Sequence, residues 1–182
     1  MTLYKDKYRI ESARLQNWDY STPSYYFVTL CTYNRANFFG DIVNGELRHS
    51  PAGEIVAEEW IKTESIRPNI KMDAWVVMPN HVHSIIIITH RLVETARRAV
   101  STCDISPKSR LKPNTLGSIV GQIKIQCTKR IRAAGIPEFD WQERFWDTIL
   151  WDEKTLANVQ LYIQNNPAQW DQDREKPPDL WM

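Results

Sequence analysis

Two adjacent segments joined by a two-residue turn constrain the fold of this chain most strongly. Residues Ile70–Met78 and 81–89 are both rich in aliphatic and β-branched side chains, and Pro79-Asn80 lies between them. Strand-forming residues on both sides of a short turn predict two paired antiparallel strands. A chain built around such a pair has to cover the apolar faces of its sheet with other elements.

Periodicity and turn signals predict that these other elements alternate between strands and helices. They are a strand at 25–32, a hairpin within 38–48, a helix from Ser50-Pro51 to Pro68, a helix at 114–134, a short strand at 145–151 and a helix at 152–165. Asn44-Gly45 is a hairpin turn signal, Asn114 is a candidate helix cap, and Gly135 follows the second helix. The order predicts an α+β fold, with one antiparallel sheet covered by helices in a ferredoxin-like arrangement.

Length and composition favour one domain, over residues 1–170 of the 182-residue chain. We expect an irregular arm at 1–24, a loop at 101–113 and a loosely ordered acidic tail at 171–182. The three cysteines are widely spaced, which predicts neither a zinc knuckle nor a disulfide framework. With no apolar signal segment and only a four-residue aliphatic run at 85–88, we expect a cytoplasmic protein without a membrane span.

Basic residues are concentrated in one part of a chain whose net charge is only +1. Residues 91–132 hold ten Lys or Arg and two acids, whereas 138–182 is acidic. Such asymmetry predicts a phosphate-binding face, although a solvated helix and loop would look the same. The candidate DNA contacts are Gln122, Lys124, Lys129, Arg132, Arg97, Arg98, Lys108, Arg110 and Lys112.

The pair His81 and His83 is a candidate metal site. Alternate side chains of a strand share a face, about 7 Å apart at Cβ, so two imidazoles at this spacing can converge on one cation. Val82 between them points into the core. Imidazole suits Mn, Co and Zn ions, and a phosphate substrate would also recruit Mg. The alternative is two histidines that cap a turn and bind no metal.

Tyr162 and Asn166 lie four residues apart in the last predicted helix. Residues at this spacing share a helical face, about 6 Å apart. A tyrosine beside a polar oxygen can sit against a metal-bound phosphate. The alternative is that Tyr162 is a core residue of an amphipathic helix, together with Val159 and Ile163.

Several blocks together resemble a known family. They are Met-Pro-Asn-His-Val-His at 78–83, Trp141-Gln142, Tyr-Ile-x-x-Asn-Pro at 162–167, and Asp19-Tyr20-Ser21 leading into Tyr26-Phe27-Val28-Thr29. The chain resembles the Y1 transposases of the IS200/IS605 type over about residues 8–170. It is most similar to the REP-associated tyrosine transposases of that group.

This resemblance implies the HUH endonuclease fold and its chemistry. His81 and His83 correspond to the residues that hold a divalent metal, Mg²⁺ or Mn²⁺, and Asn166 stands where insertion-sequence relatives place a third ligand, a glutamine. Tyr162 corresponds to the nucleophile that forms a 5′-phosphotyrosine. Such proteins bind hairpin DNA, including repetitive extragenic palindromes, and cut and rejoin single-stranded DNA. A bacterial protein of this kind is nucleoid-associated when bound to DNA, and its state, monomer or homodimer, stays open.

The chain departs from the family pattern at one block. Relatives often have Tyr-Asp-His-Ile-Ile-Arg where this chain has Trp-Asp-Thr-Ile-Leu-Trp at 146–151, so a His and an Arg are missing and Trp151 would replace charge with stacking. The main alternative function is a catalytically inactive hairpin-binding protein for DNA or RNA. A metal-dependent hydrolase with water as nucleophile, and a structural protein whose histidines bind nothing, are further alternatives.

Overall fold

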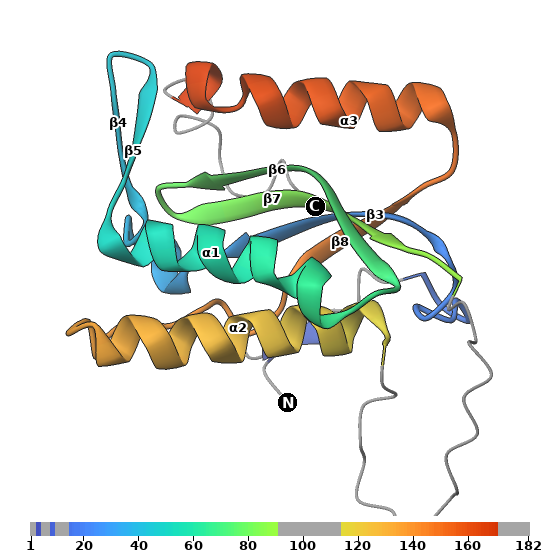
Figure 1. The fold of residues 1–182 in the computed structure, drawn as a ribbon, viewed down its shortest axis with the longest axis horizontal. Helices are drawn as coiled ribbons and strands as arrows, with labels where there is room; N and C mark the ends of the chain where they lie inside the picture. Colours follow the sequence, from blue (N-terminus) through green and yellow to red (C-terminus); the bar gives the residue numbers. More distant parts are fainter. Residues whose placement is uncertain (1–2, 5–7, 10–14, 91–113, 171–182) are drawn as a thin grey trace, which may run out of the picture.

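A four-stranded antiparallel sheet forms the centre of the molecule in a computed structural model (Figure 1). The structure describes residues 3–4, 8–9, 15–90 and 114–170. The strands in spatial order are β6 (Ile70–Met78), β7 (His81–Ile88), β3 (Ser24–Cys31) and β8 (Trp146–Leu150). Helix α1 (Pro51–Ile66) connects β3 to β6, and α2 (Leu116–Ala133) lies between β7 and β8 in the chain. This β-α-β-β-α-β order with antiparallel neighbours confirms the predicted ferredoxin-like α+β fold.

The helices divide between the two faces of the sheet. Figure 1 shows α1 and α2 on one face and α3 (Glu153–Asn165) on the other. Strand β7 contributes side chains to both faces, because successive residues of a strand point to opposite sides. Val82 packs in the cluster under α1 and α2, whereas Ile85 packs against α3. On the α1 side, the indole nitrogen of Trp60 donates to the Ser84 hydroxyl at 2.9 Å, and both side chains are fully buried.

Two short hairpins flank the sheet. Strands β4 (Gly40–Val43) and β5 (Glu46–His49) pair as predicted, and Asn44 and Gly45 at their turn have φ of 55° and 78°. Positive φ at both turn residues matches the twist of a tight hairpin. Strands β1 (Leu3–Tyr4) and β2 (Tyr8–Arg9) also pair, so the prediction of an irregular arm was wrong at these residues.

One predicted helix cap was also wrong. The Thr115 hydroxyl, not Asn114, accepts the Ser118 N–H at 3.2 Å and caps α2. Asn114 has a left-handed backbone with φ 66°, and its side-chain oxygen instead accepts from Arg67 at 3.2 Å. At the other end Gly135 follows the helix with φ 99°, as its position predicted.

Two sequence predictions lie outside the described residues, namely the loop at 101–113 and the acidic tail at 171–182. Within the described ranges, none of the helices is long and apolar enough to cross a membrane.

Candidate active site

The four predicted site residues come together between β7 and α3. The imidazole rings of His81 and His83 are 4.4 Å apart between centroids. The Tyr162 hydroxyl lies 3.3 Å from His83 Nε2, and the Asn166 side chain lies beside His81. The four-residue spacing of Tyr162 and Asn166 along a helix, about 6 Å, matches the two-residue spacing of the histidines along a strand, about 6.6 Å. The tyrosine and the asparagine therefore each face one histidine.

Asn80 fixes the orientation of His81. Its amide nitrogen donates to the Arg35 carbonyl at 3.2 Å, so its amide oxygen faces His81 Nδ1 at 2.8 Å. Because this oxygen can only accept, His81 Nδ1 carries the hydrogen. The lone pair of His81 is therefore on Nε2, the atom available to a metal.

Two residues of the neighbouring strand hold His83. The Thr29 hydroxyl lies 2.9 Å from His83 Nδ1, and Thr29 is the direct register partner of His83 across β3 and β7. The Phe27 ring stacks on the imidazole at 5.4 Å with an interplanar angle of 27°. Neither contact has a local signal in the sequence, because both depend on which strand pairs with β7.

Both histidines are neutral at physiological pH. Burial, with the nearby Arg35 charge, lowers the pKa of His81 to about 3 against the opposing effect of the neighbouring Asn166 amide. Burial, with His81 and Arg35, lowers the pKa of His83 well below its usual value. Neutral imidazoles keep the lone pairs that a metal requires. Arg35 is exposed, and sequence reasoning missed it as a source of positive charge at this site.

The side chains present fit a divalent metal. Asn166 is 1% exposed, and the oxygen of its amide would be the ligand atom, whereas the amide nitrogen, which only donates, has no hydrogen-bond partner. In the described part of the chain, no three His, Cys, Asp or Glu side chains form a group that would hold a metal. Two imidazoles and one amide would therefore be an uncharged ligand set.

Comparison with known proteins gives a relative and a fold. An uncharacterized protein of Haemophilus influenzae is 31% identical over 163 residues, which cover 90% of this chain and 91% of that protein. The chain belongs to the family of this Haemophilus influenzae protein. No family model matches the sequence. A solved REP-associated tyrosine transposase bound to a REP hairpin is similar with a TM-score of 0.56 at 20% identity, covering 87% of this chain and 74% of that one. The tyrosine transposase fold predicted by the resemblance is thereby confirmed.

In this member of the family, helix α2 lies on the face of the sheet opposite the candidate site (Figure 1). Three of its four predicted DNA contacts bind neighbouring segments of the protein. Gln122 accepts from Arg67, Lys124 donates to the carbonyls of Gln142 and Arg144 at 2.6 and 3.1 Å, and Arg132 donates to the Phe139 carbonyl at 3.0 Å.

The predicted DNA contacts differ in how accessible they are. Lys124 is partly buried, and this burial lowers its pKa to about 8. Lys129 is exposed on α2. Arg97, Arg98, Lys108, Arg110 and Lys112 lie outside the described residues.

The block that departs from the family pattern lies on the edge strand β8. Trp151, directly after the strand, is 66% exposed and makes an edge contact with Trp18 at 5.0 Å.

Proposed function

We propose that the protein is a metal-dependent endonuclease and strand transferase of the tyrosine transposase type, acting on single-stranded DNA beside hairpins such as repetitive extragenic palindromes. The observation that carries the proposal is the Tyr162 hydroxyl, 3.3 Å from His83 Nε2 in the cluster with His81 and Asn166. A tyrosine packed only for its apolar area would not need to place its hydroxyl at a histidine pair. The hairpin bound by the similar solved structure supports the choice of substrate.

The proposed reaction is a phosphoryl transfer to Tyr162. Its oxygen attacks the phosphorus, the bond to the 3′ oxygen breaks, and the tyrosine retains the 5′ phosphate. The phenolic proton leaves to water, and the departing 3′ oxygen takes up a proton. The phosphodiester energy is kept in the phosphotyrosine, so the 3′-hydroxyl of another strand can rejoin the DNA.

His81, His83 and Asn166 are the residues that would hold the divalent metal, Mg²⁺ or Mn²⁺. The cation would supply positive charge to the non-bridging oxygens of the phosphate. Because all three protein ligands are uncharged, none of that charge would be neutralised before the DNA binds. The exposed Arg35, whose charge reaches both histidines, would contact the same phosphate or its neighbour.

All four site residues come from one chain, so a monomer can supply the complete centre. We assign Lys129 and the basic residues of 91–113 to the DNA backbone away from the cut. Such contacts fix register and make affinity fall as salt rises. We place this activity in the cytoplasm of a bacterium, on the nucleoid.

The test is cleavage of a labelled single strand that carries a hairpin, with Mn²⁺ present. The wild type should cut it, and Tyr162→Phe should bind the same DNA without cutting. Tyr33→Phe is the matched control, because this tyrosine is 58% exposed in a short helix (Tyr33–Arg35) and should leave cleavage unchanged. Cleavage by Tyr162→Phe at the wild-type rate would reject the mechanism. Binding without cleavage by the wild type would favour the inactive hairpin-binding alternative.

A denaturing gel separates tyrosine attack from hydrolysis by water. The proposed mechanism predicts a DNA–protein adduct that survives denaturation and maps to Tyr162 by mass spectrometry. Cleavage without any adduct would favour a hydrolase with water as nucleophile.

A further inference from the structure

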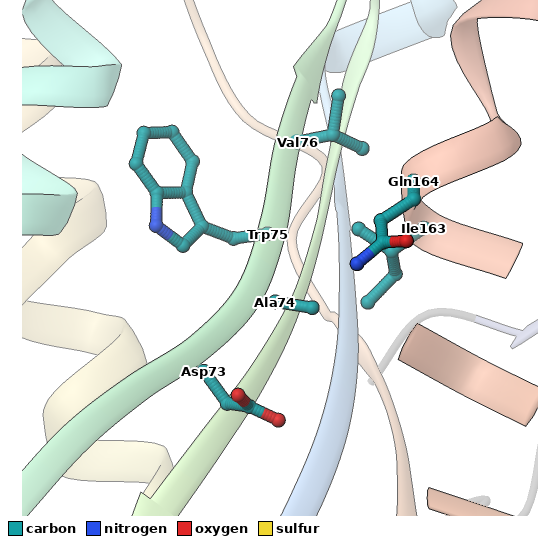
Figure 2. A pocket seen from close by; sticks show the side chains of 6 residues that line it. All are labelled: Asp73, Ala74, Trp75, Val76, Ile163 and Gln164. Atoms are coloured by element: carbon teal, nitrogen blue, oxygen red, sulfur yellow. The ribbon is translucent and has the colours of Figure 1, made fainter. Parts of the chain in front are cut away.

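A cleft of about 400 Å³ lies between β6 and α3, beside the candidate active site (Figure 2). Its lining residues are Asp73, Ala74, Trp75, Val76, Ile163 and Gln164. In Figure 2 the Trp75 ring points away from α3, to the other side of β6. The side chains left in the cleft are therefore an apolar floor between a carboxylate and an amide.

A bulge in β6 creates this arrangement. The pairing with β7 shifts between Met72 and Trp75, and both of these side chains pack on the α1 and α2 face. The residues between them are thus displaced from simple alternation, and Ala74 packs on the α3 face. Asp73 is half-buried here, and its Oδ2 accepts from Gln160 of α3 at 2.6 Å. Bulges commonly re-aim side chains next to active sites.

The cleft is adjacent to the residues proposed to cut DNA. Val76 in its floor is the direct register partner of His83 across β6 and β7. Neighbouring strands are about 4.8 Å apart, so the cleft is one strand away from the histidine pair. On the helix side, Ile163 and Gln164 directly follow Tyr162. A strand with its phosphate at Tyr162 would have a neighbouring nucleotide within reach of the cleft.

We propose that this cleft binds a guanine base next to the cut phosphate, an inference that rests on the proposed function. The Asp73 carboxylate repels phosphate and can only accept hydrogen bonds, so it selects a base edge with donors. Guanine presents N1–H and N2–H side by side, a match to the two carboxylate oxygens, and its O6 matches the Gln164 amide as donor. Cytosine, adenine and thymine each offer the carboxylate one donor group. Ala74 and Val76, which are partly exposed, would contact the face of the base.

Binding of single strands tests the cleft without any cleavage. The probes are fluorescent thymidine 12-mers with one central guanine, adenine or cytosine, measured by anisotropy with EDTA present. We expect guanine to bind about five-fold to about a hundred-fold more tightly than the other bases, as a bidentate contact discriminates. Inosine, which lacks the N2 amine, should lose most of this preference, and 7-deazaguanine, which keeps the paired edge, should retain it. Equal binding of all bases would overturn the proposal.

Variants connect the preference to the cleft. Asp73→Asn keeps the size of the side chain and a hydrogen-bond acceptor for Gln160, and it should abolish the guanine preference. Gln164→Ala changes an exposed residue, so the protein should fold normally, and the preference should weaken. Glu153→Gln, which removes one negative charge from the exposed first turn of α3, is the control and should leave the preference intact. An unchanged preference in Asp73→Asn would place guanine recognition elsewhere and reject the proposal.

The two proposals fail in different ways. A guanine preference that depends on Asp73, in a protein that cuts no strand, would reject the proposed function and leave the base site standing. Cleavage of hairpin-bearing strands with equal binding of all bases would reject the base site alone.

Discussion

Replacing Thr29 by valine should weaken metal binding without disturbing the sheet. Thr29 lies in β3 between β7 and β8, and its hydroxyl is 2.9 Å from His83 Nδ1. Valine has nearly the same shape and forms strands equally well. The substitution therefore removes one hydroxyl oxygen and leaves the packing volume in place.

The size of the effect follows from the burial of His83. This side chain is only 3% exposed, so water cannot replace the lost partner. An unsatisfied buried polar group costs about 1–3 kcal/mol of unfolding free energy. Without the hydroxyl, Nδ1 loses its hydrogen-bond partner, and the ring is less firmly oriented. Loss of such a supporting hydrogen bond typically lowers metal affinity about 10–100-fold.

The assay is Mn²⁺ titration by calorimetry, combined with urea unfolding of the same proteins. Thr29→Ser restores a hydroxyl and should recover most of the affinity. Thr63→Val is the matched control, because its hydroxyl is also buried but donates to the Glu59 carbonyl within α1, on the opposite face of the sheet. It should lose stability and keep its Mn²⁺ affinity. A Thr29→Val affinity within two-fold of the wild type would refute the reasoning.

Three further predictions concern stability. Ser84→Ala should lower the unfolding free energy by about 1–3 kcal/mol in urea titration, because it leaves the buried Trp60 indole N–H without its acceptor; an unchanged value would mean that water enters the core there. Gly53→Ala should also lower the unfolding free energy, by about 1–3 kcal/mol, because a Cβ at this position would lie 2.1 Å from the Phe39 carbonyl oxygen. The cost of this clash should outweigh the higher helix propensity of alanine, and a gain in stability would refute this. Burial raises the pKa of Cys127 to about 12, so above pH 9 the thiol ionises in the unfolded chain but not in the folded one. The unfolding free energy should therefore fall as pH rises, by at most about 1.4 kcal/mol per pH unit. Urea unfolding of Cys127→Ala at pH 8 to 11 should show a shallower fall than the wild type, and identical slopes would contradict the assignment.

The elements that could be predicted from sequence are those with strong local signals. Strand β6 runs over Ile70–Met78 as predicted, because an aliphatic run ends at a proline turn. The turn at Asn44-Gly45 was predicted correctly for the same local reason. The cap of α2 was wrong because Asn114 and Thr115 are both good capping residues, and the choice between them depends on Arg67, 47 residues away.

The candidate site likewise combines residues with local sequence signals and residues placed by contacts distant in the sequence. His81, His83, Tyr162 and Asn166 were paired by spacings of two and four residues, and their roles came from the family resemblance of the surrounding blocks. Thr29 is 54 residues from His83 in sequence, and its role follows only from the pairing of β3 with β7. The cleft at Asp73 depends on a bulge, which the alternation of residues in β6 does not reveal.

The two faces of the sheet differ in how much apolar surface they bury. The main core lies under α1 and α2, whereas the buried cluster that holds α3 consists of Ile85, Leu150 and Ile163. Less buried apolar area stabilises the α3 contact, so separating α3 from the sheet costs less free energy than unfolding the main core. The polar side chains of the proposed active site are all on this weaker face. Small movements of α3, which would admit a strand under the proposed function, therefore need not open the core that keeps β7 in place.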